Sequence, residues 1–185
     1  MTYVMNSLRA YRWFGVWCVA AVLAAGAIAH AAQTLRIVPI VHDNQVLVTF
    51  EVADGYTGDV RDAISSGLRT TFSYDVELRM VAHGWVDPKV ATAVISTSDR
   101  FDNLTRRHTL TRTVDGRETE SITTEDEATV RQWLTMIDKV AICRTSKLEA
   151  NRDYYVRVSA RVVDHSSMLG WTSALVGRTP FTFIP

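Results

Sequence analysis

The sequence predicts a mainly β fold: a β-sandwich of two antiparallel sheets, to which two short α-helices are added. Apolar and polar residues alternate along several stretches, and this two-residue period is typical of strands with one buried face. Turn-forming residues separate these stretches at short intervals. Only two segments show the three-to-four-residue period of an amphipathic helix.

The first two expected strands form a hairpin. The stretches LRIVPIVH (35–42) and QVLVTFEV (45–52) flank Asp43-Asn44, a two-residue loop of the kind that accepts positive φ. Because proline has no N–H to donate, Pro39 places the first strand at a sheet edge. Pairing across the loop sets only apolar residues opposite each other on one face: Val41 with Val46, Pro39 with Val48, Ile37 with Phe50, and Leu35 with Val52.

A short helix and a regular strand follow the hairpin. Asp59 is expected to cap the helix and Gly67 to end it, with Val60, Ala63 and Ile64 on its buried face. The strand is TFSYDVELRM (71–80), in which strict alternation predicts a sheet with one solvated face. Its inward residues are Phe72, Tyr74, Val76, Leu78 and Met80.

After a turn at 84–88 and a strand over 89–97, the chain reaches FDNLTRRHTLTR (101–112), which is rich in arginine. As a strand over 104–114 it has no face apolar enough for a core. The preferred interpretation is a solvated edge strand whose charges prevent pairing with another chain. The alternative is recognition of an acidic partner, or of a peptide by strand addition. The candidate partner-binding residues are Arg106, Arg107, His108 and Arg112.

The second helix follows a turn at Asp115-Gly116. Thr124 and Glu127 have the spacing of a capping box, so the acidic tract before the helix has a structural purpose. The helix is expected to end near Asp138. Its buried face consists of Val130, Trp133, Leu134 and Ile137.

The last third of the chain reads as strand, corner and strand over 139–164, with a closing strand over 176–184. Leu148 lies six residues before Tyr154, which begins an alternating apolar run. This spacing resembles the tyrosine corner of immunoglobulin-like and fibronectin type III sandwiches, in which the phenol hydroxyl bonds to upstream backbone. Phe50 departs from that pattern, because a fibronectin module usually has tryptophan there.

The N-terminal residues 1–31 are expected to be a signal peptide, which leaves 32–185 as one decorated β-sandwich domain. A basic start, an uncharged apolar run over 13–29 and the small residues of AHA (29–31) form the typical export pattern. The alternative is an uncleaved inner-membrane anchor formed by 13–29. Without the leader the net charge is about −2, which gives no bulk electrostatic reason to bind nucleic acid or anionic lipid. Cys143 then has no partner for an internal disulfide.

Four segments, in this order and spacing, together resemble one family: DAISSGLRTTFSYDVEL (62–78), DNLTRRHTLTR (102–112), TEDEATVRQWL (124–134) and LEANRDYYVRV (148–158). The family is DUF4390, an uncharacterised family of exported bacterial proteins. The resemblance implies one domain in the cell envelope, and it brings no established activity or site residues. Members encoded beside sensor kinases imply an accessory role in signalling.

Signals for catalysis are weak in this sequence. No close Cys/His spacing indicates a structural zinc site, no serine-nucleophile motif occurs, and no glycine-rich loop indicates a nucleotide or other cofactor. The hypothesis of a metal-assisted hydrolase uses two Asp/His pairs, which are His42 with Asp43 and Asp164 with His165.

These observations favour a non-catalytic exported binding module of the periplasm or cell envelope, with another envelope protein as its partner. The envelope hydrolase is the alternative, and a membrane-tethered sensory accessory is the third hypothesis. The sequence leaves the oligomeric state open.

Overall fold

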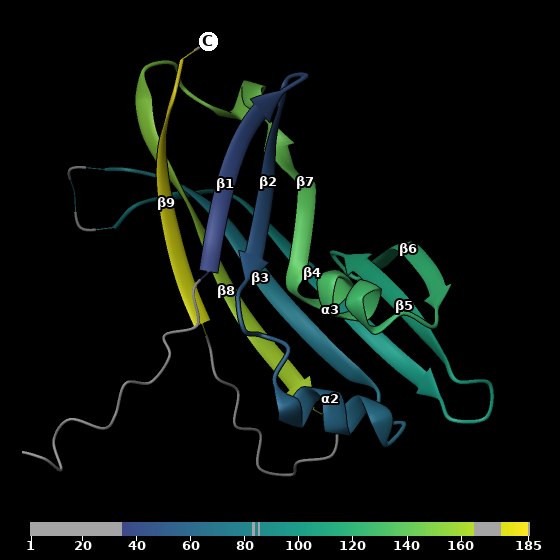
Figure 1. Cartoon of the computed structure of the whole chain (residues 1–185). Helices are drawn as coiled ribbons and strands as arrows, with labels where there is room; N and C mark the ends of the chain where they lie inside the picture. Colours follow the sequence, from purple (N-terminus) through teal and green to yellow (C-terminus); the bar gives the residue numbers. More distant parts are fainter. Residues whose placement is uncertain (1–34, 83, 85, 165–174, 185) are drawn as a thin grey trace, which may run out of the picture. The chain divides into compact units, whose positions relative to one another are not determined.

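Strands form two antiparallel sheets in the computed structural model, which describes residues 35–82, 84, 86–164 and 175–184 (Figure 1). The smaller sheet has the order β1-β2-β7 and the larger one β6-β5-β4-β3-β8-β9. The mainly β fold with two added helices is therefore confirmed, whereas the predicted signal peptide lies outside the described residues. The bounds are β1 Leu35–His42, β2 Gln45–Val52, α2 Gly58–Ser65, β3 Thr70–Met80, β4 Lys89–Asp102, β5 Arg107–Val114, β6 Arg117–Thr124, α3 Glu127–Thr135, β7 Met136–Arg144, η1 Thr145–Lys147, β8 Arg152–Asp164 and β9 Leu175–Phe183.

The strand order matches that of an immunoglobulin-like sandwich. In the smaller sheet, β1, β2 and β7 occupy the places of strands A, B and E of that fold. In the larger sheet, β9, β8, β3 and β4 follow the order of strands G, F, C and C′. β5 and β6 extend this sheet beyond β4, so the resemblance to immunoglobulin-like folds extends to topology.

The β1–β2 hairpin has the predicted register. Val41 pairs with Val46, and the remaining pairs down to Leu35 and Val52 follow without a shift. Asp43 and Asn44 have φ of 48° and 59°, the left-handed conformation that a two-residue hairpin loop requires. Pro39 lies in an edge strand, as its missing N–H predicts.

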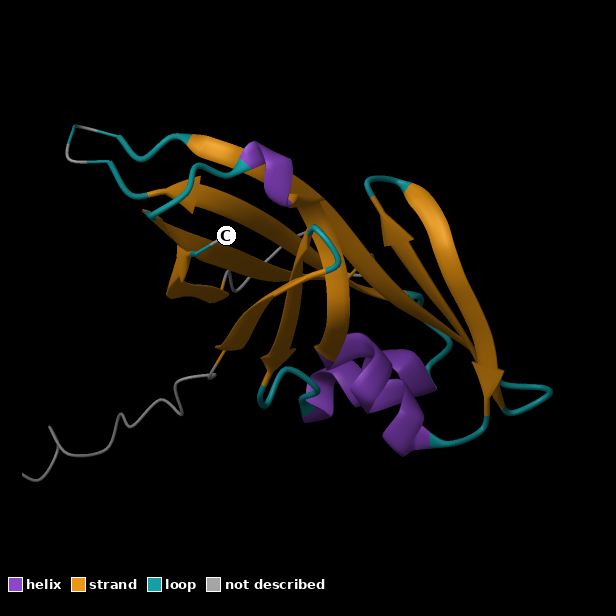
Figure 2. Ribbon diagram, turned by 90° about the horizontal axis from the view of Figure 1, so that it is seen from above, coloured by secondary structure: helices purple, strands orange, loops and turns teal. Residues whose placement is uncertain are grey.

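The core lies between the sheets and beneath α3. The four residues of β3 from Phe72 to Leu78 that were predicted to point inward are all buried. Tyr74 packs edge-to-face on Phe50 of the smaller sheet, with ring centroids 5.0 Å apart. The smaller sheet faces one part of the larger sheet, and α3 lies over another part, where it contacts β3, β4 and β5 (Figure 2). A three-stranded sheet is too narrow to cover six strands, so the helix completes the core.

The tyrosine corner is present at the turn between β7 and β8. The Tyr154 side chain is buried, and its hydroxyl oxygen accepts a hydrogen bond from the backbone N–H of Glu149 at 2.7 Å. Leu148 packs against the core beside it. The corner therefore occupies the position between strands E and F that the immunoglobulin-like pattern predicts.

Both helices begin at a different cap from the one predicted. Asp126, rather than Thr124, caps α3 by accepting hydrogen bonds from the backbone N–H groups of Ala128 and Thr129. Thr57, rather than Asp59, caps α2. In each case a neighbouring oxygen-bearing side chain fills the same role, which sequence spacing alone does not distinguish.

The α3 helix is also shorter than predicted. It ends at Thr135, and the chain passes into β7 at Met136 without a loop, so the buried Ile137 belongs to the strand. The carbonyl of Leu134 therefore lacks its helical donor. Instead it accepts hydrogen bonds from the hydroxyls of Tyr74 and of Thr97, the latter at 3.2 Å.

The prediction that the arginine-rich strand lies at a sheet edge is wrong. β5 pairs with β4 on one side and β6 on the other, and β6 is the edge strand. Leu110 of β5 is fully buried, so one face of β5 does reach the core. β6 was not predicted as a strand because it has no apolar alternation and is mostly exposed. Strand addition to β5 is not available, since both of its edges are occupied.

Replacement of Tyr74 by phenylalanine tests the bond to the Leu134 carbonyl. Tyr74→Phe should lower the free energy of unfolding by about 1–2 kcal/mol, because a buried acceptor loses one of its two donors. Urea titration followed by circular dichroism measures the change. Tyr56→Phe is the matched control, because the Tyr56 hydroxyl has no hydrogen-bond partner among the described residues, and it should cost less than about 0.5 kcal/mol. Equal losses in the two variants would contradict this account.

Candidate functional site

One of the two predicted Asp/His pairs lies wholly within the described residues. His42 and Asp43 lie at the β1–β2 turn, where their exposed side chains contact each other at 3.2 Å. That turn is beside the β7–β8 corner, since Thr145 donates a backbone hydrogen bond to Asn44. Asp164 ends β8 opposite Thr70, at the other end of a strand of 13 residues, and His165 lies outside the described residues. The β1–β2 turn and the end of β8 lie at opposite ends of the sandwich (Figure 1). Because His165 is not among the described residues, the hydrolase hypothesis stays a prediction.

The four predicted partner-binding residues have different environments. Arg112 is half-buried, bonds Glu120 at 3.0 Å and stacks over Trp133 of α3 with 4.2 Å from guanidinium carbon to ring centroid. This arginine therefore packs on a residue of the core. Arg107 pairs with Glu125 at 2.9 Å on the surface. Arg106, at the β4–β5 turn, makes no ion pair within the described part of the chain.

His108 belongs to a buried polar pair. Its Nδ1 lies 2.8 Å from Oδ2 of Asp99 on β4, whose side chain is fully buried. The imidazole also packs against Phe101, with ring centroids 4.5 Å apart. Burial raises the pKa of Asp99 above its ordinary value, and the bond to His108 opposes this effect. The other carboxylate oxygen, Oδ1, has no hydrogen-bond partner within the described part of the chain.

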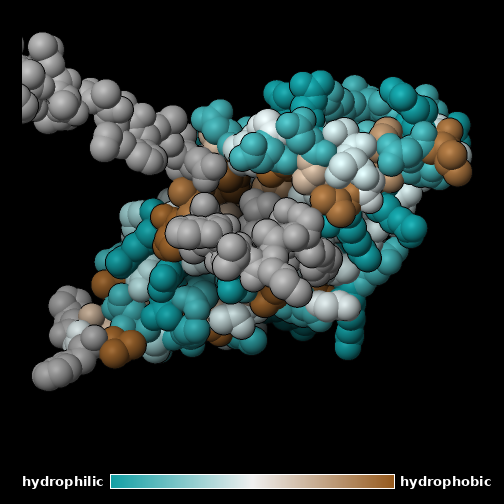
Figure 3. Space-filling view, turned by 90° about the horizontal axis from the view of Figure 1, so that it is seen from below, coloured by the Kyte–Doolittle hydropathy of each residue, from teal (hydrophilic) through white to brown (hydrophobic). Residues whose placement is uncertain are grey.

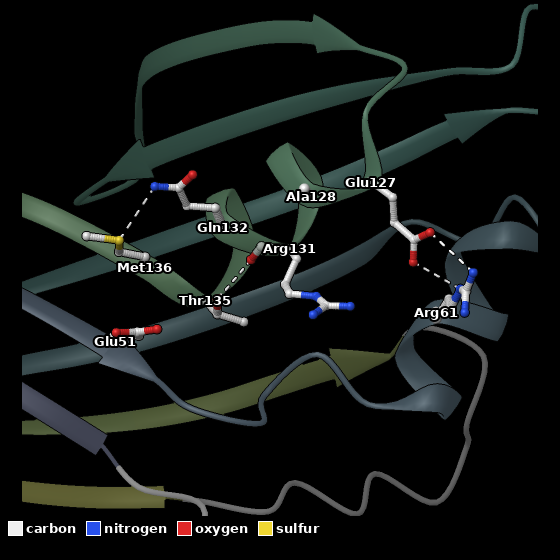
Figure 4. Close-up of a pocket in the computed structure, with 8 residues that line it drawn as sticks. All are labelled: Glu51, Arg61, Glu127, Ala128, Arg131, Gln132, Thr135 and Met136. Atoms are coloured by element: carbon white, nitrogen blue, oxygen red, sulfur yellow. Dashed lines mark hydrogen bonds and ion pairs between the residues drawn. The ribbon is translucent and has the colours of Figure 1, made fainter.

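A cleft lies between α2 and α3, and an ion pair divides it. Arg61 of α2 reaches Glu127 of α3 through Nε at 3.0 Å and Nη2 at 3.2 Å (Figure 4). On one side is a cavity of about 560 Å³, here called the α3 cavity, which is lined by Glu51, Arg61, Glu127, Ala128, Arg131, Gln132, Thr135 and Met136. On the other is a cavity of about 380 Å³, here called the His108 cavity, which is lined by Tyr56, Arg61, Ile64, Ser65, Phe101, Arg106, His108, Glu125 and Glu127.

Some of the charged side chains that line the His108 cavity have ion-pair partners, and one has none among the described residues. Glu127 pairs with Arg61 and Glu125 with Arg107, so both acids have a cationic partner. Arg106 has no anionic partner among the described residues. Burial, followed by the charge of Glu127, raises the pKa of Tyr56, which keeps the phenol neutral. Among the charged side chains that line this cavity, Arg106 is therefore a cation with no partner of opposite charge in the described part of the chain.

A family model for a domain of unknown function, DUF4390, matches residues 29–168. The chain belongs to the DUF4390 family. Comparison with curated proteins and with solved structures gives no match. The match ends before β9, although that strand completes the larger sheet of this DUF4390 chain. Three of the four segments that resemble the family border the cleft: 62–78 includes the end of α2, 102–112 the β4–β5 turn, and 124–134 most of α3.

Arg106 and His108 were predicted as functional residues and Ile64 as a buried one, whereas Tyr56, Phe101 and Asp99 were not predicted as site residues. Asp99 lies two residues beyond Thr97, where the predicted strand ends, so its inward position was not predicted. Tyr56 precedes α2 and Phe101 lies near the end of β4, and neither position lies in a predicted helix or strand. Alternation extended past Thr97 would have placed Asp99 on the inward face, since Ile95, Thr97 and Asp99 are all fully buried.

Two further findings concern what the described residues contain. Neither helix in the described part of this DUF4390 chain has the length and hydropathy needed to cross a membrane. Within the same residues, no three histidine, cysteine or acidic side chains converge as metal ligands. Cys143 is half-buried in β7, and burial raises the pKa of its thiol, which lowers the fraction of reactive thiolate.

The buried Asp99 carboxyl predicts a pH-dependent difference between the native chain and Asp99→Asn. The folded-state pKa of Asp99 lies above the ordinary value of 3.8, so the folded state holds this proton more tightly than the unfolded chain does. The stabilising contribution is present below about pH 4 and is lost as pH rises through the raised pKa. Asp99→Asn, which has no such proton, should therefore gain stability relative to the native chain between about pH 4 and about pH 7. Urea unfolding of both proteins at the two pH values measures the difference in their free energies of unfolding. A difference that is the same at both pH values would refute the expectation.

Proposed function

We propose that this DUF4390 chain is an exported, non-catalytic binding module of the bacterial envelope that docks another envelope protein through its β4–β5 turn. The export pattern of residues 1–31 supports the location, and the sandwich supplies a rigid support for exposed turns. An immunoglobulin-like topology is compatible with many functions, so the proposal depends on the turn itself.

The exposure of Leu104 is the observation that carries the proposal. Its side chain is 95% exposed, the most exposed of the large hydrophobic residues in the described part of the chain. On the face drawn in Figure 3, hydrophobic residues lie in small groups among mainly hydrophilic ones. A leucine held in water at the tip of a turn contributes nothing to the core, and burying it against a partner would be favourable by about 1.5–3 kcal/mol.

The turn that presents Leu104 is fixed by hydrogen bonds. Asp102 accepts bonds from the backbone N–H groups of Leu104 at 2.8 Å and Thr105 at 3.3 Å, and its carbonyl accepts one from Arg106 at 2.8 Å. These bonds hold the pKa of the Asp102 carboxyl below its ordinary value, so it stays ionised. A turn ordered in advance loses little conformational freedom on binding, which favours recognition.

The charge beside Leu104 defines the partner's chemistry. Arg106 has no ion pair within the described residues, and Arg107 is held by Glu125. A complementary partner has an apolar pocket for the leucine and a carboxylate at its rim for Arg106. This narrows the predicted partner-binding set to Arg106 with Leu104, because Arg112 packs on Trp133.

Replacement of Leu104 by aspartate tests the docking turn. Leu104→Asp should abolish crosslinking of the protein to its partner in cells, because it places a charge in an apolar contact and repels the carboxylate expected beside Arg106. Arg106→Glu should give the same loss. The measurement is the pattern of crosslinked bands in cells that express each variant at the native level.

Val86→Asp is the matched control for this experiment. Val86 is also an exposed aliphatic residue on a turn, 74% accessible, but it lies at the opposite end of β4. Its replacement should leave the bands unchanged. Loss of the bands in Val86→Asp, or their persistence in Leu104→Asp, would contradict docking at this turn.

Export is tested separately by the N-terminus of the mature protein. We expect the protein in the periplasmic fraction to begin at Ala32 or Gln33, because AHA at 29–31 provides the small residues that precede cleavage. N-terminal sequencing measures this. A full-length chain in the membrane fraction would instead support the membrane-tethered accessory.

A further inference from the structure

We propose that the His108 cavity binds a carboxylate that carries an apolar group. This inference goes beyond the proposed docking of a partner by Leu104, because it concerns a cavity beside that turn and a ligand of different size. It rests on two groups with free hydrogen-bonding capacity, on an excess of positive charge, and on apolar walls.

The first free group is the outer edge of the His108 imidazole. Asp99 occupies Nδ1 at 2.8 Å and thereby fixes the orientation of the ring. The other nitrogen, Nε2, makes no hydrogen bond among the described residues, and His108 lines the cavity. In the protonated ring, Nε2–H can donate to a carboxylate oxygen while Nδ1–H remains with Asp99.

The second free group is the guanidinium of Arg106. It lines the same cavity and has neither an ion pair nor a side-chain hydrogen bond within the described part of the chain. The backbone of Arg106 is held at φ 58° by the β4–β5 turn, which sets where its side chain begins. A guanidinium binds a planar carboxylate through two parallel N–H bonds, so an anion of this shape fits the group best.

The acids of the cavity do not cancel this charge. Glu125 is paired with Arg107 at 2.9 Å and Glu127 with Arg61 at 3.0 Å. An entering anion therefore meets Arg106 as the uncompensated charge, while the paired glutamates discourage ligands with several negative groups. This favours a monocarboxylate over a phosphate or a dicarboxylate.

Apolar side chains form the rest of the wall. Ile64 of α2 is almost fully buried, and Phe101 packs its ring on His108. Tyr56 adds an aromatic face that remains uncharged. The volume of about 380 Å³ lies within the range of small-molecule sites. A ligand with one carboxylate and one aromatic or branched group would place the first at Arg106 and the second against these side chains.

The test uses N-acetylphenylalanine as the probe and N-acetylphenylalaninamide as its neutral match. When the acid is titrated into the isotope-labelled, processed protein, the NMR signals of the His108 ring and the Arg106 side chain should shift. The amide should bind at least about tenfold more weakly. Phenylpropanoate, which lacks the peptide unit, distinguishes two sources: equal binding indicates a free acid, and preference for the acetylated amino acid indicates a peptide C-terminus.

Three variants assign the binding to the cavity. Arg106→Gln should weaken binding of the acid about tenfold, whereas Arg117→Gln removes an equal charge at the β5–β6 turn and should have no effect. His108→Asn should also weaken binding and still fold, because the asparagine amide can donate to Asp99 in place of Nδ1–H. A thermal melt of each variant verifies folding.

Equal binding of acid and amide, or full binding in both Arg106→Gln and His108→Asn, would overturn the proposal. Leu104→Asp keeps the cavity residues, so it should bind the probe normally while losing the partner. Arg106 belongs to both proposals, so Leu104→Asp is the variant that separates failure of one from failure of the other.

Discussion

The carbonyl of Leu134 is the point on which the arrangement of this sandwich depends. The smaller sheet cannot cover the inner face of the larger one, and α3 closes what remains of the core. Because α3 passes directly into β7, no loop can absorb an error in its position. The hydroxyls of Tyr74 and Thr97 bond the free carbonyl from β3 and β4, and so fix the end of the helix to the larger sheet. A buried carbonyl without these donors would cost about 1–3 kcal/mol, so helix, sheet and β7 have one compatible placement.

That placement determines the cleft. With its C-terminal end fixed and Asp126 capping its start, α3 presents Glu127 toward α2, where Arg61 meets it. The ion pair is exposed and by itself contributes little to stability. Its consequence is geometric, because it separates the His108 cavity from the α3 cavity and occupies the negative charge of Glu127. An interaction of small energetic value therefore controls the charge that a ligand would meet.

The sequence predicted those parts of the fold that local periodicity and turn chemistry specify. The hairpin at Asp43-Asn44, the alternation of β3 and the corner at Tyr154 each combine a buried face with a nearby turn residue, so one observation fixes the other. β6 was not predicted because it is mostly exposed and has no apolar alternation. β5 was misjudged because its inward positions hold His108, Leu110 and Arg112, and burial of the two polar ones depends on Asp99 and Trp133 of other elements. Hydrophobic patterning cannot reveal such pairs, and His108 lines the proposed cavity.

The Asp99–His108 pair is a weak means of stabilising a core. Its acid is fully buried, one carboxylate oxygen has no partner in the described residues, and burial disfavours the charged form. Replacing a buried polar pair by apolar residues of similar volume is often neutral or stabilising. A pair placed here for stability alone would therefore be a poor choice. The pair instead orients the ring: it holds one imidazole edge at the wall of the His108 cavity, which Phe101 and Arg106 also line, and Arg106 has no ion pair within the described residues. The energetic cost of Asp99 is intelligible if that edge has a ligand to meet.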